Sequence, residues 1–105
     1  MSEKVAFRMR LRPGCLEAYR QRHDAVWPDL SAALKAAGVR DYSIHHDPET
    51  DALFATMWRD DAARVAALAD SDVMRRWWAS MAPLMVTNPD LSPETVPLDT
   101  VFHLD

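Results

Sequence analysis

This 105-residue chain contains few glycines, a single cysteine and no excess of positive charge. The single cysteine, Cys15, can form no internal disulfide. With only two glycines, the chain has no Gly-rich phosphate loop and no dinucleotide-binding pattern. The formal net charge of -4 leaves no surplus of lysine and arginine for binding a phosphate backbone, so we expect no nucleic-acid partner.

Long apolar runs are missing as well. Charged residues interrupt every hydrophobic segment before it reaches the roughly 20 residues that span a bilayer, and nothing at the start resembles a signal peptide. We therefore predict a cytoplasmic protein with no membrane role. The remaining composition, 49% hydrophobic and 27% charged, is that of an ordinary globular protein. Its length suits a single domain, residues 1–105, around one core.

Hydrophobic periodicity predicts the secondary structure. A period of two indicates strands at residues 5–11, 39–46 and 98–104, and residues 52–59 fit a strand that closes a hairpin with the second. Apolar spacings of three and four indicate helix from 16 to 34, kinked or restarted at Pro28 and ended near Gly38. Two further helical pieces are expected at 62–69 and 73–81. Residues 85–97, with three prolines, are an irregular connection long enough to help form a site.

The resulting order, βαββαβ, predicts an α+β fold of the ferredoxin-like type, an antiparallel sheet with both helical layers on one face. The other face then lacks a cover. Ala6, Val101 and either Phe54 or Trp58 are the candidates for that face. A second copy packing sheet against sheet would bury them, so we predict a homodimer.

The sequence gives little support for a metal site or for a catalytic nucleophile. His45 and His46 are adjacent on a strand and project to opposite faces, so one ion cannot readily take both, and we predict no metal site. Cys15 lies at a helix start without an identifiable base, and no serine occupies a nucleophile elbow. The carboxylates are scattered over turns and helix surfaces, and none forms an evident glycosidase pair.

Aromatic residues and one histidine form the more suggestive pattern. Tyr19 and His23 lie on one helical face, and histidine exchanges protons near neutral pH. Periodicity alone favours a hydrogen-bonded core histidine over a catalyst. Tyr42 could likewise bury its ring and satisfy its hydroxyl locally, or orient a polyol. Trp77 and Trp78 cannot both lie in one core seam, because neighbouring helical positions diverge by about 100°. One of them could stack on a sugar or join a subunit interface.

At these positions the sequence resembles the L-rhamnose mutarotase family across nearly its whole length. The resemblance is carried by residues 19–24 (YRQRHD), 27–30 (WPDL), 41–44 (DYSI), 76–78 (RWW) and 88–93 (NPDLSP). It implies a dimeric α+β barrel, an isomerase acting on a sugar, and no metal or organic cofactor. It also implies that His23 is the proton donor and that Tyr19, Tyr42, Trp77 and Trp78 bind the sugar.

The chain departs from that family pattern in two places. Leu91 stands where a polar residue is expected, and the pair His45-His46 replaces a less basic pair. Both differences bear on substrate choice, so L-fucose stays open beside L-rhamnose. Two other interpretations stay open too. Small dimeric α+β barrels include cofactor-free monooxygenases and haem-handling proteins, and the chain could be a sugar-binding module without turnover.

Overall fold

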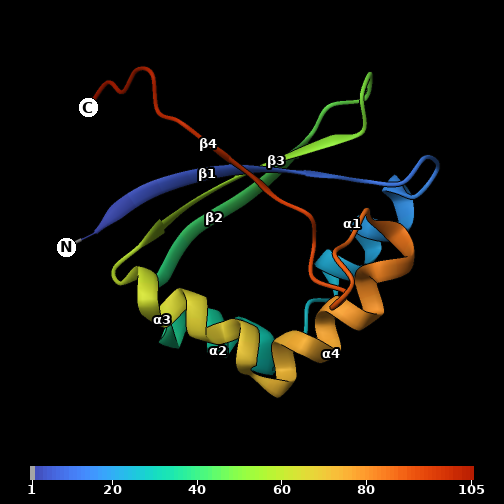
Figure 1. The fold of residues 1–105 in the computed structure, drawn as a ribbon, viewed down its shortest axis with the longest axis horizontal. Helices are drawn as coiled ribbons and strands as arrows, with labels where there is room; N and C mark the ends of the chain where they lie inside the picture. Colours follow the sequence, from blue (N-terminus) through green and yellow to red (C-terminus); the bar gives the residue numbers. More distant parts are fainter. Residues whose placement is uncertain (1) are drawn as a thin grey trace.

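The computed structural model describes residues 2–105, which form one sheet and a layer of helices (Figure 1). The strands are β1 (Glu3–Arg10), β2 (Val39–His46), β3 (Ala52–Arg59) and β4 (Val96–Leu98). The helices are α1 (Leu16–Asp24), α2 (Pro28–Ala36), α3 (Ala62–Ala67) and α4 (Asp72–Met81), with short 3-10 turns η1 (Leu68–Asp70) and η2 (Ala82–Leu84).

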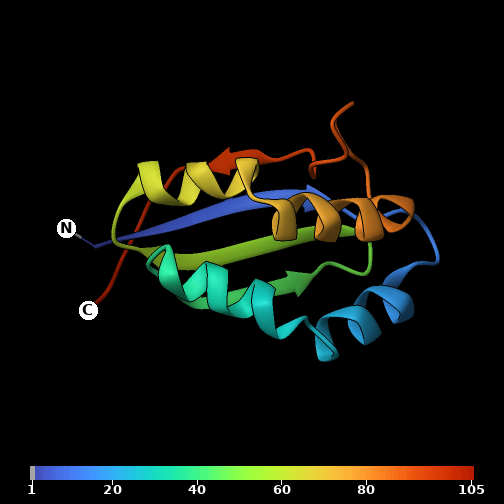
Figure 2. The same ribbon diagram turned by 90° about the horizontal axis from the view of Figure 1, so that it is seen from below.

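The sheet has the strand order β2-β3-β1-β4, and every neighbouring pair is antiparallel. All four helices lie against one face of it, as the view from the helical side shows (Figure 2). This order and layering confirm the predicted ferredoxin-like α+β fold.

Alternation along the central strands divides the sheet into two faces. On β3, Leu53, Ala55 and Met57 are almost fully buried toward the helices, and Met9 of β1 joins them. The side chains between them point the other way. Lys4 pairs with Trp58 and Arg8 with Phe54, so both large aromatic residues lie on the uncovered face, where the sequence predicted one or the other.

The predicted break in the first helix is confirmed. α1 ends at Asp24, and α2 begins with Pro28 as its first helical residue and Trp27 as its N-cap. Proline suits that position because its missing N–H would have no partner there. Gly38 follows α2 with a φ of 87°, a backbone conformation that glycine adopts without strain. On either side of this break, Tyr19 of α1 and Leu30 of α2 belong to the same hydrophobic core.

The prediction for the final strand was wrong. β4 spans only Val96–Leu98, where it pairs with residues 6–8 of β1, and residues 99–105 form no regular structure. Val101 therefore lies outside the sheet and is 94% exposed. Alternating side chains show that a segment can be extended, but they do not show which strand it pairs with. Here the chain leaves β1 after Leu98.

The first strand also differs slightly from its prediction. It runs from Glu3 to Arg10, and Leu11, expected within it, makes only an isolated bridge with Met85. Leu11 is nonetheless 1% exposed and belongs to the core. The apolar alternation continues into the core, but the ladder of backbone hydrogen bonds stops earlier.

Candidate functional site

A cavity of about 800 Å³ lies between the inner face of the sheet and the helices. Its size is in the range typical of small-molecule sites. Most of its lining is apolar, with a few polar side chains. All five residues predicted to act on a sugar line it: Tyr19, His23, Tyr42, Trp77 and Trp78. The fold thus brings together residues that are up to 59 positions apart in the chain.

His23 is half-buried and held in one orientation. Its Nδ1 lies 3.0 Å from the backbone carbonyl oxygen of Tyr19, one helical turn earlier. A carbonyl only accepts, so Nδ1 carries the hydrogen in this contact. The imidazole ring also stacks on the Tyr19 ring, with centroids 4.3 Å apart, and meets Trp77 at 5.4 Å. Nε2 therefore remains as the atom that can exchange a proton with a ligand.

The two tyrosines keep their hydroxyl protons. Burial, and secondarily the neighbouring Tyr42, raises the pKa of Tyr19 far above that of a free phenol. Burial raises the pKa of Tyr42 to about 12. Tyr42 lines the cavity, and as a whole residue it is 40% exposed. At neutral pH both side chains are thus neutral hydrogen-bonding groups, and neither is a ready base.

Two tryptophans, Trp77 and Trp78, line the cavity, and Trp27 packs against Trp77 outside its lining. Trp77 is buried in the core and meets the ring of Trp27 edge to face, with centroids 5.2 Å apart. Trp78 is half-buried on the cavity wall. Trp77 contacts both His23 and Trp27, so the aromatic cluster spans the break between α1 and α2.

Two arginines make contacts between the helices that carry these aromatic residues. Arg76 of α4 binds Asp72 at 2.8 Å and approaches Asp29 of α2 at 3.6 Å. Its guanidinium also lies over the Trp27 ring, 5.6 Å from the centroid. Arg22 of α1 donates a hydrogen bond to the backbone carbonyl of Ser80. The contacts with Asp29 and the Trp27 ring link α4 to the start of α2, and the bond from Arg22 links α1 to α4.

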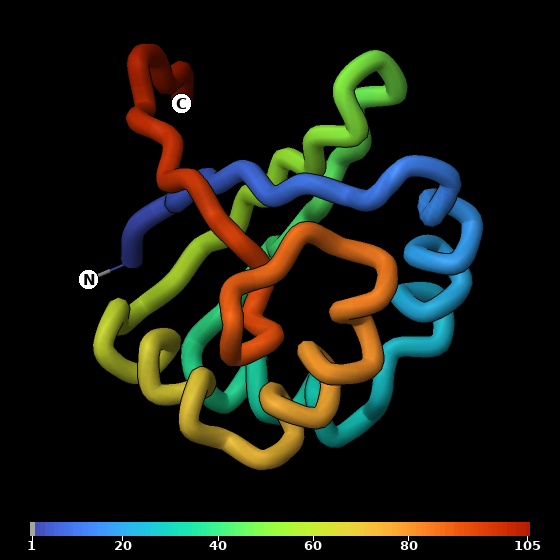
Figure 3. The backbone as a smooth tube through the Cα atoms, turned by 45° about the vertical axis from the view of Figure 1, so that its right-hand side comes forward, coloured from blue at the N-terminus to red at the C-terminus, as the bar shows by residue number. Residues whose placement is uncertain are grey.

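The loop between η2 and β4 supplies part of the wall, as its length predicted. Asn88 and Ser92 line the cavity, and Asn88 is hydrogen-bonded to Ser92 through both backbone and side chain. The loop folds back beside α1 and α4 (Figure 3). At its tip, Leu91 has a φ of 72°, a left-handed conformation that asparagine and glycine adopt more easily than leucine. The departure from the family pattern therefore falls on a strained backbone position.

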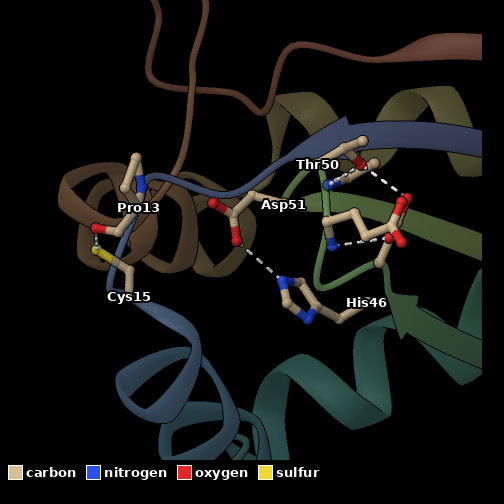
Figure 4. A network of polar contacts seen from close by, with 8 residues as sticks. Pro13, Cys15, His46, Thr50 and Asp51 are labelled. Atoms are coloured by element: carbon tan, nitrogen blue, oxygen red, sulfur yellow. Dashed lines mark hydrogen bonds and ion pairs between the residues drawn. The ribbon is translucent and has the colours of Figure 1, made fainter.

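Sequence reasoning gave no role to several other lining residues. Asp24, next to His23, carries a carboxylate at the cavity wall. His46 also lines the cavity, and its Nε2 lies 3.0 Å from Asp51 Oδ1 (Figure 4). The alternation of β2 places His46 on the same face as Tyr42 and Ile44, so the face of the sheet to which His46 points was predictable. Its contact with Asp51 was not predictable, because Asp51 follows a turn and has a left-handed backbone conformation, with a φ of 62°.

Within residues 2–105, no helix is long and apolar enough to cross a bilayer. The same residues contain no group of three or more His, Cys, Asp or Glu side chains placed to hold a metal ion.

Known proteins resemble this chain in sequence and in fold. An L-rhamnose mutarotase from Sinorhizobium fredii is 56% identical over 102 residues, covering 97% of this chain and 98% of the relative. The crystal structure of an L-rhamnose mutarotase from Formosa agariphila superposes with a TM-score of 0.91 at 42% identity, covering 98% of this chain and 99% of that one. The Mycobacterium tuberculosis protein Rv0793 has a TM-score of 0.63 at 15% identity over the full length of both chains, a likeness of fold alone. The sequence profile of the L-rhamnose mutarotase family matches residues 4–104, and this chain belongs to that family.

Proposed function

We propose that this protein is an L-rhamnose mutarotase, an isomerase that interconverts the α and β anomers of L-rhamnopyranose. One observation carries the proposal most directly. His23 is fixed through Nδ1, so its Nε2 can face a cavity walled by two neutral tyrosines and two tryptophans. Mutarotation needs only proton transfer and positioning, which such a site can supply.

The reaction opens and recloses the sugar ring. Protonated His23 delivers a proton from Nε2 to the ring oxygen as the bond from that oxygen to the anomeric carbon breaks. A base takes the proton of the anomeric hydroxyl, and the carbonyl of the open aldehyde forms. Rotation about the C1–C2 bond then presents the other carbonyl face, and closure returns both protons.

Asp24 is our choice for the base. Among the described residues that line the cavity, it is the one that carries a carboxylate, and it adjoins His23 in the chain. The tyrosines are poor candidates because their raised pKa values keep them protonated. A water molecule in the cavity is the alternative acceptor.

The remaining residues bind the sugar. The hydroxyls of Tyr19 and Tyr42 donate and accept hydrogen bonds with sugar hydroxyls, and the indoles of Trp77 and Trp78 cover its C–H faces. An apolar wall suits the methyl group of a 6-deoxy sugar. L-fucose carries the same methyl group, so it is the alternative substrate.

We further propose a cytoplasmic homodimer in which two sheets pack face to face and complete a dimeric α+β barrel. The uncovered face carries Phe54, which is 38% exposed, together with Ala6 and Trp58. Covering such a face with a second copy would remove this apolar area from water. The cytoplasmic location agrees with a single cysteine, Cys15, that makes no disulfide.

Saturation-transfer NMR of anomer exchange tests the activity directly. We expect trace protein to accelerate α/β exchange of L-rhamnose near neutral pH, and the ratio to the rate with L-fucose gives the substrate preference. The variant His23→Ala should lose about 100-fold or more of the rate while remaining folded. Glu17→Gln, on the exposed side of the same helix, is the matched control and should keep full activity.

Two results would contradict the proposal. Full activity in the His23→Ala variant would remove histidine as proton donor. Quenching of tryptophan fluorescence by L-rhamnose without faster exchange in the native protein would instead indicate a binding module.

A further inference from the structure

His46 places a polar ring in an otherwise apolar row of the cavity wall. In the sheet, His46 of β2 pairs with Leu53 of β3, which pairs with Met9 of β1, and all three line the cavity. Leu53 and Met9 are 1% and 5% exposed, and the side chain of His46 is 15% exposed. An apolar side chain at position 46 would complete this row without the cost of desolvating a polar ring. Packing alone therefore does not account for the histidine.

Asp51 fixes the orientation and the tautomer of His46. A carboxylate only accepts hydrogen bonds, so His46 Nε2, which lies 3.0 Å from Asp51 Oδ1, carries the hydrogen in this contact (Figure 4). The two nitrogens of an imidazole ring face in widely different directions, so Nδ1 points away from Asp51. In the neutral ring Nδ1 then has a lone pair and no hydrogen, and it acts as a hydrogen-bond acceptor.

This Nδ1 is accessible to a ligand. Within residues 2–105 it has no hydrogen-bond partner, and the hydrogen bond to Asp51 occupies the other nitrogen of the ring. In the same part of the chain, no side-chain nitrogen or oxygen atom is both buried and unpaired. Since His46 lines the cavity, the cavity is the space from which a small molecule reaches this atom.

The turn between β2 and β3 is closed without the contact between His46 and Asp51. Asp47 N donates a backbone hydrogen bond to Ala52 O at 2.8 Å, and Asp51 N donates one to Asp47 O at 2.9 Å. Thr50 Oγ1 adds a hydrogen bond to Asp47 Oδ2 at 2.8 Å. The turn therefore holds Asp51 in place, and the Asp51 carboxylate in turn preorganises the ring of His46.

Of the two adjacent histidines that set this chain apart from the family pattern, His46 is the one on the cavity side. His45 pairs with Phe54 across β2 and β3 and is exposed on the opposite face of the sheet. An effect of this pair on the choice of sugar therefore comes from His46.

We propose that His46 is a specificity-determining residue of the sugar site and that Asp51 is its positioning residue. His46 Nδ1 accepts a hydrogen bond from one ring hydroxyl of the sugar, at the end of the cavity next to the turn between β2 and β3. This role rests on the sugar site proposed above and deepens it. A sugar that lacks the hydroxyl leaves Nδ1 unpaired, so the site favours a 6-deoxy sugar over a dideoxy sugar.

A thermodynamic cycle tests the contact. Dissociation constants are measured by quenching of tryptophan fluorescence with L-rhamnose and with its 2-deoxy, 3-deoxy and 4-deoxy analogues, for the native protein and for His46→Leu. For one analogue, the loss of affinity relative to L-rhamnose should be about 10-fold smaller in the variant than in the native protein. The matched control His45→Leu should behave like the native protein. Equal losses in His46→Leu and the native protein for all three analogues would overturn the proposal.

Two variants of Asp51 test the positioning role. Asp51→Ala frees the ring of His46 and should weaken the dependence on the same hydroxyl, whereas Asp51→Asn keeps an oxygen that accepts from Nε2 and should restore most of it. A lower melting temperature in Asp51→Ala with an unchanged dependence on that hydroxyl would show that the pair only supports the turn. That result would overturn the role of Asp51.

Anomer exchange measured on the same variants distinguishes this role from the proposed function. His46→Leu should raise KM for L-rhamnose and leave kcat within about 2-fold, because the hydrogen bond is made equally in the ground state and the transition state. A loss of kcat at unchanged KM would overturn the specificity role. Native protein that accelerates exchange but shows no coupling between His46 and a hydroxyl would refute this inference alone. Coupling in binding without faster exchange would refute the proposed function alone.

Discussion

Tyr42 provides the sharpest test of the proton assignments in the cavity. If burial raises its pKa to about 12, only about one molecule in 1,000 has an ionised Tyr42 at pH 9, against about one in ten for an ordinary phenol. A tyrosinate base would then be almost absent over the whole working range. We expect the rate of anomer exchange to show no alkaline limb near pH 10 that belongs to Tyr42.

The variant Tyr42→Phe removes the hydroxyl and keeps the ring. It should lower kcat/KM about 2- to 13-fold, which corresponds to the loss of one hydrogen bond to the sugar of about 0.5–1.5 kcal/mol. The shape of the pH profile should stay the same, because neutral Tyr42 moves no proton. Saturation-transfer NMR between pH 6 and 10 measures both quantities.

Absorbance of the phenolate provides an independent measurement. In the native protein, two tyrosines should titrate well above pH 10, and in the variant only one should remain. A raised folded-state pKa also means that the folded protein holds its proton longer than the unfolded chain. This stabilising contribution is complete below pH 10 and is lost as pH rises through 12. An alkaline limb near pH 10 that disappears in Tyr42→Phe would refute the reasoning and make Tyr42 the base.

Three further substitutions follow from the geometry. Leu91→Asn should raise the melting temperature by about 2–6 °C in calorimetry, because asparagine tolerates the φ of 72° better; Leu91→Ala removes the same side chain without that relief and should give no increase. Asp24→Asn should lower kcat about 100-fold at unchanged KM if its carboxylate accepts the anomeric proton; an unchanged kcat would indicate water instead. Trp77→Ala should cost about 3–5 kcal/mol of unfolding free energy in urea denaturation and abolish activity, whereas a stable, active variant would contradict its place between His23 and Trp27.

Much of the fold was predictable because local patterns and global packing agree here. The caps Asp61 and Ser71 accept hydrogen bonds from the backbone at the starts of α3 and α4, where the sequence marks helix starts. Pro28 marks the second half of the broken helix. The final strand was mispredicted because residues 99–105 alternate like a strand but pair with no strand of the described sheet. An isolated chain pattern does not distinguish a strand that pairs within the molecule from one that packs elsewhere.

The site was predictable to a lesser degree. The resemblance named the five residues that the cavity brings together, whereas periodicity alone favoured a core role for His23. The hydrogen bond of His23 to the Tyr19 carbonyl and the pairing of His46 with Asp51 depend on tertiary geometry. Sequence spacing could indicate on which face of a helix or strand each residue lies, but not which residue its side chain contacts.

The alternation of the sheet also separates the two proposed functions of the molecule. In β1, Phe7 and Met9 line the cavity, while Ala6 and Arg8 between them face away from it. Neighbouring residues of one strand therefore belong to the proposed sugar site and to the proposed dimer face, on opposite sides of the sheet. Because a slip of one residue in the pairing of β1 would exchange both sets, the buried face fixes the association face as well. Substitutions at Arg8 should thus change dimer affinity and leave anomer exchange per protomer unaltered, so an equal loss of both would show that the faces are coupled.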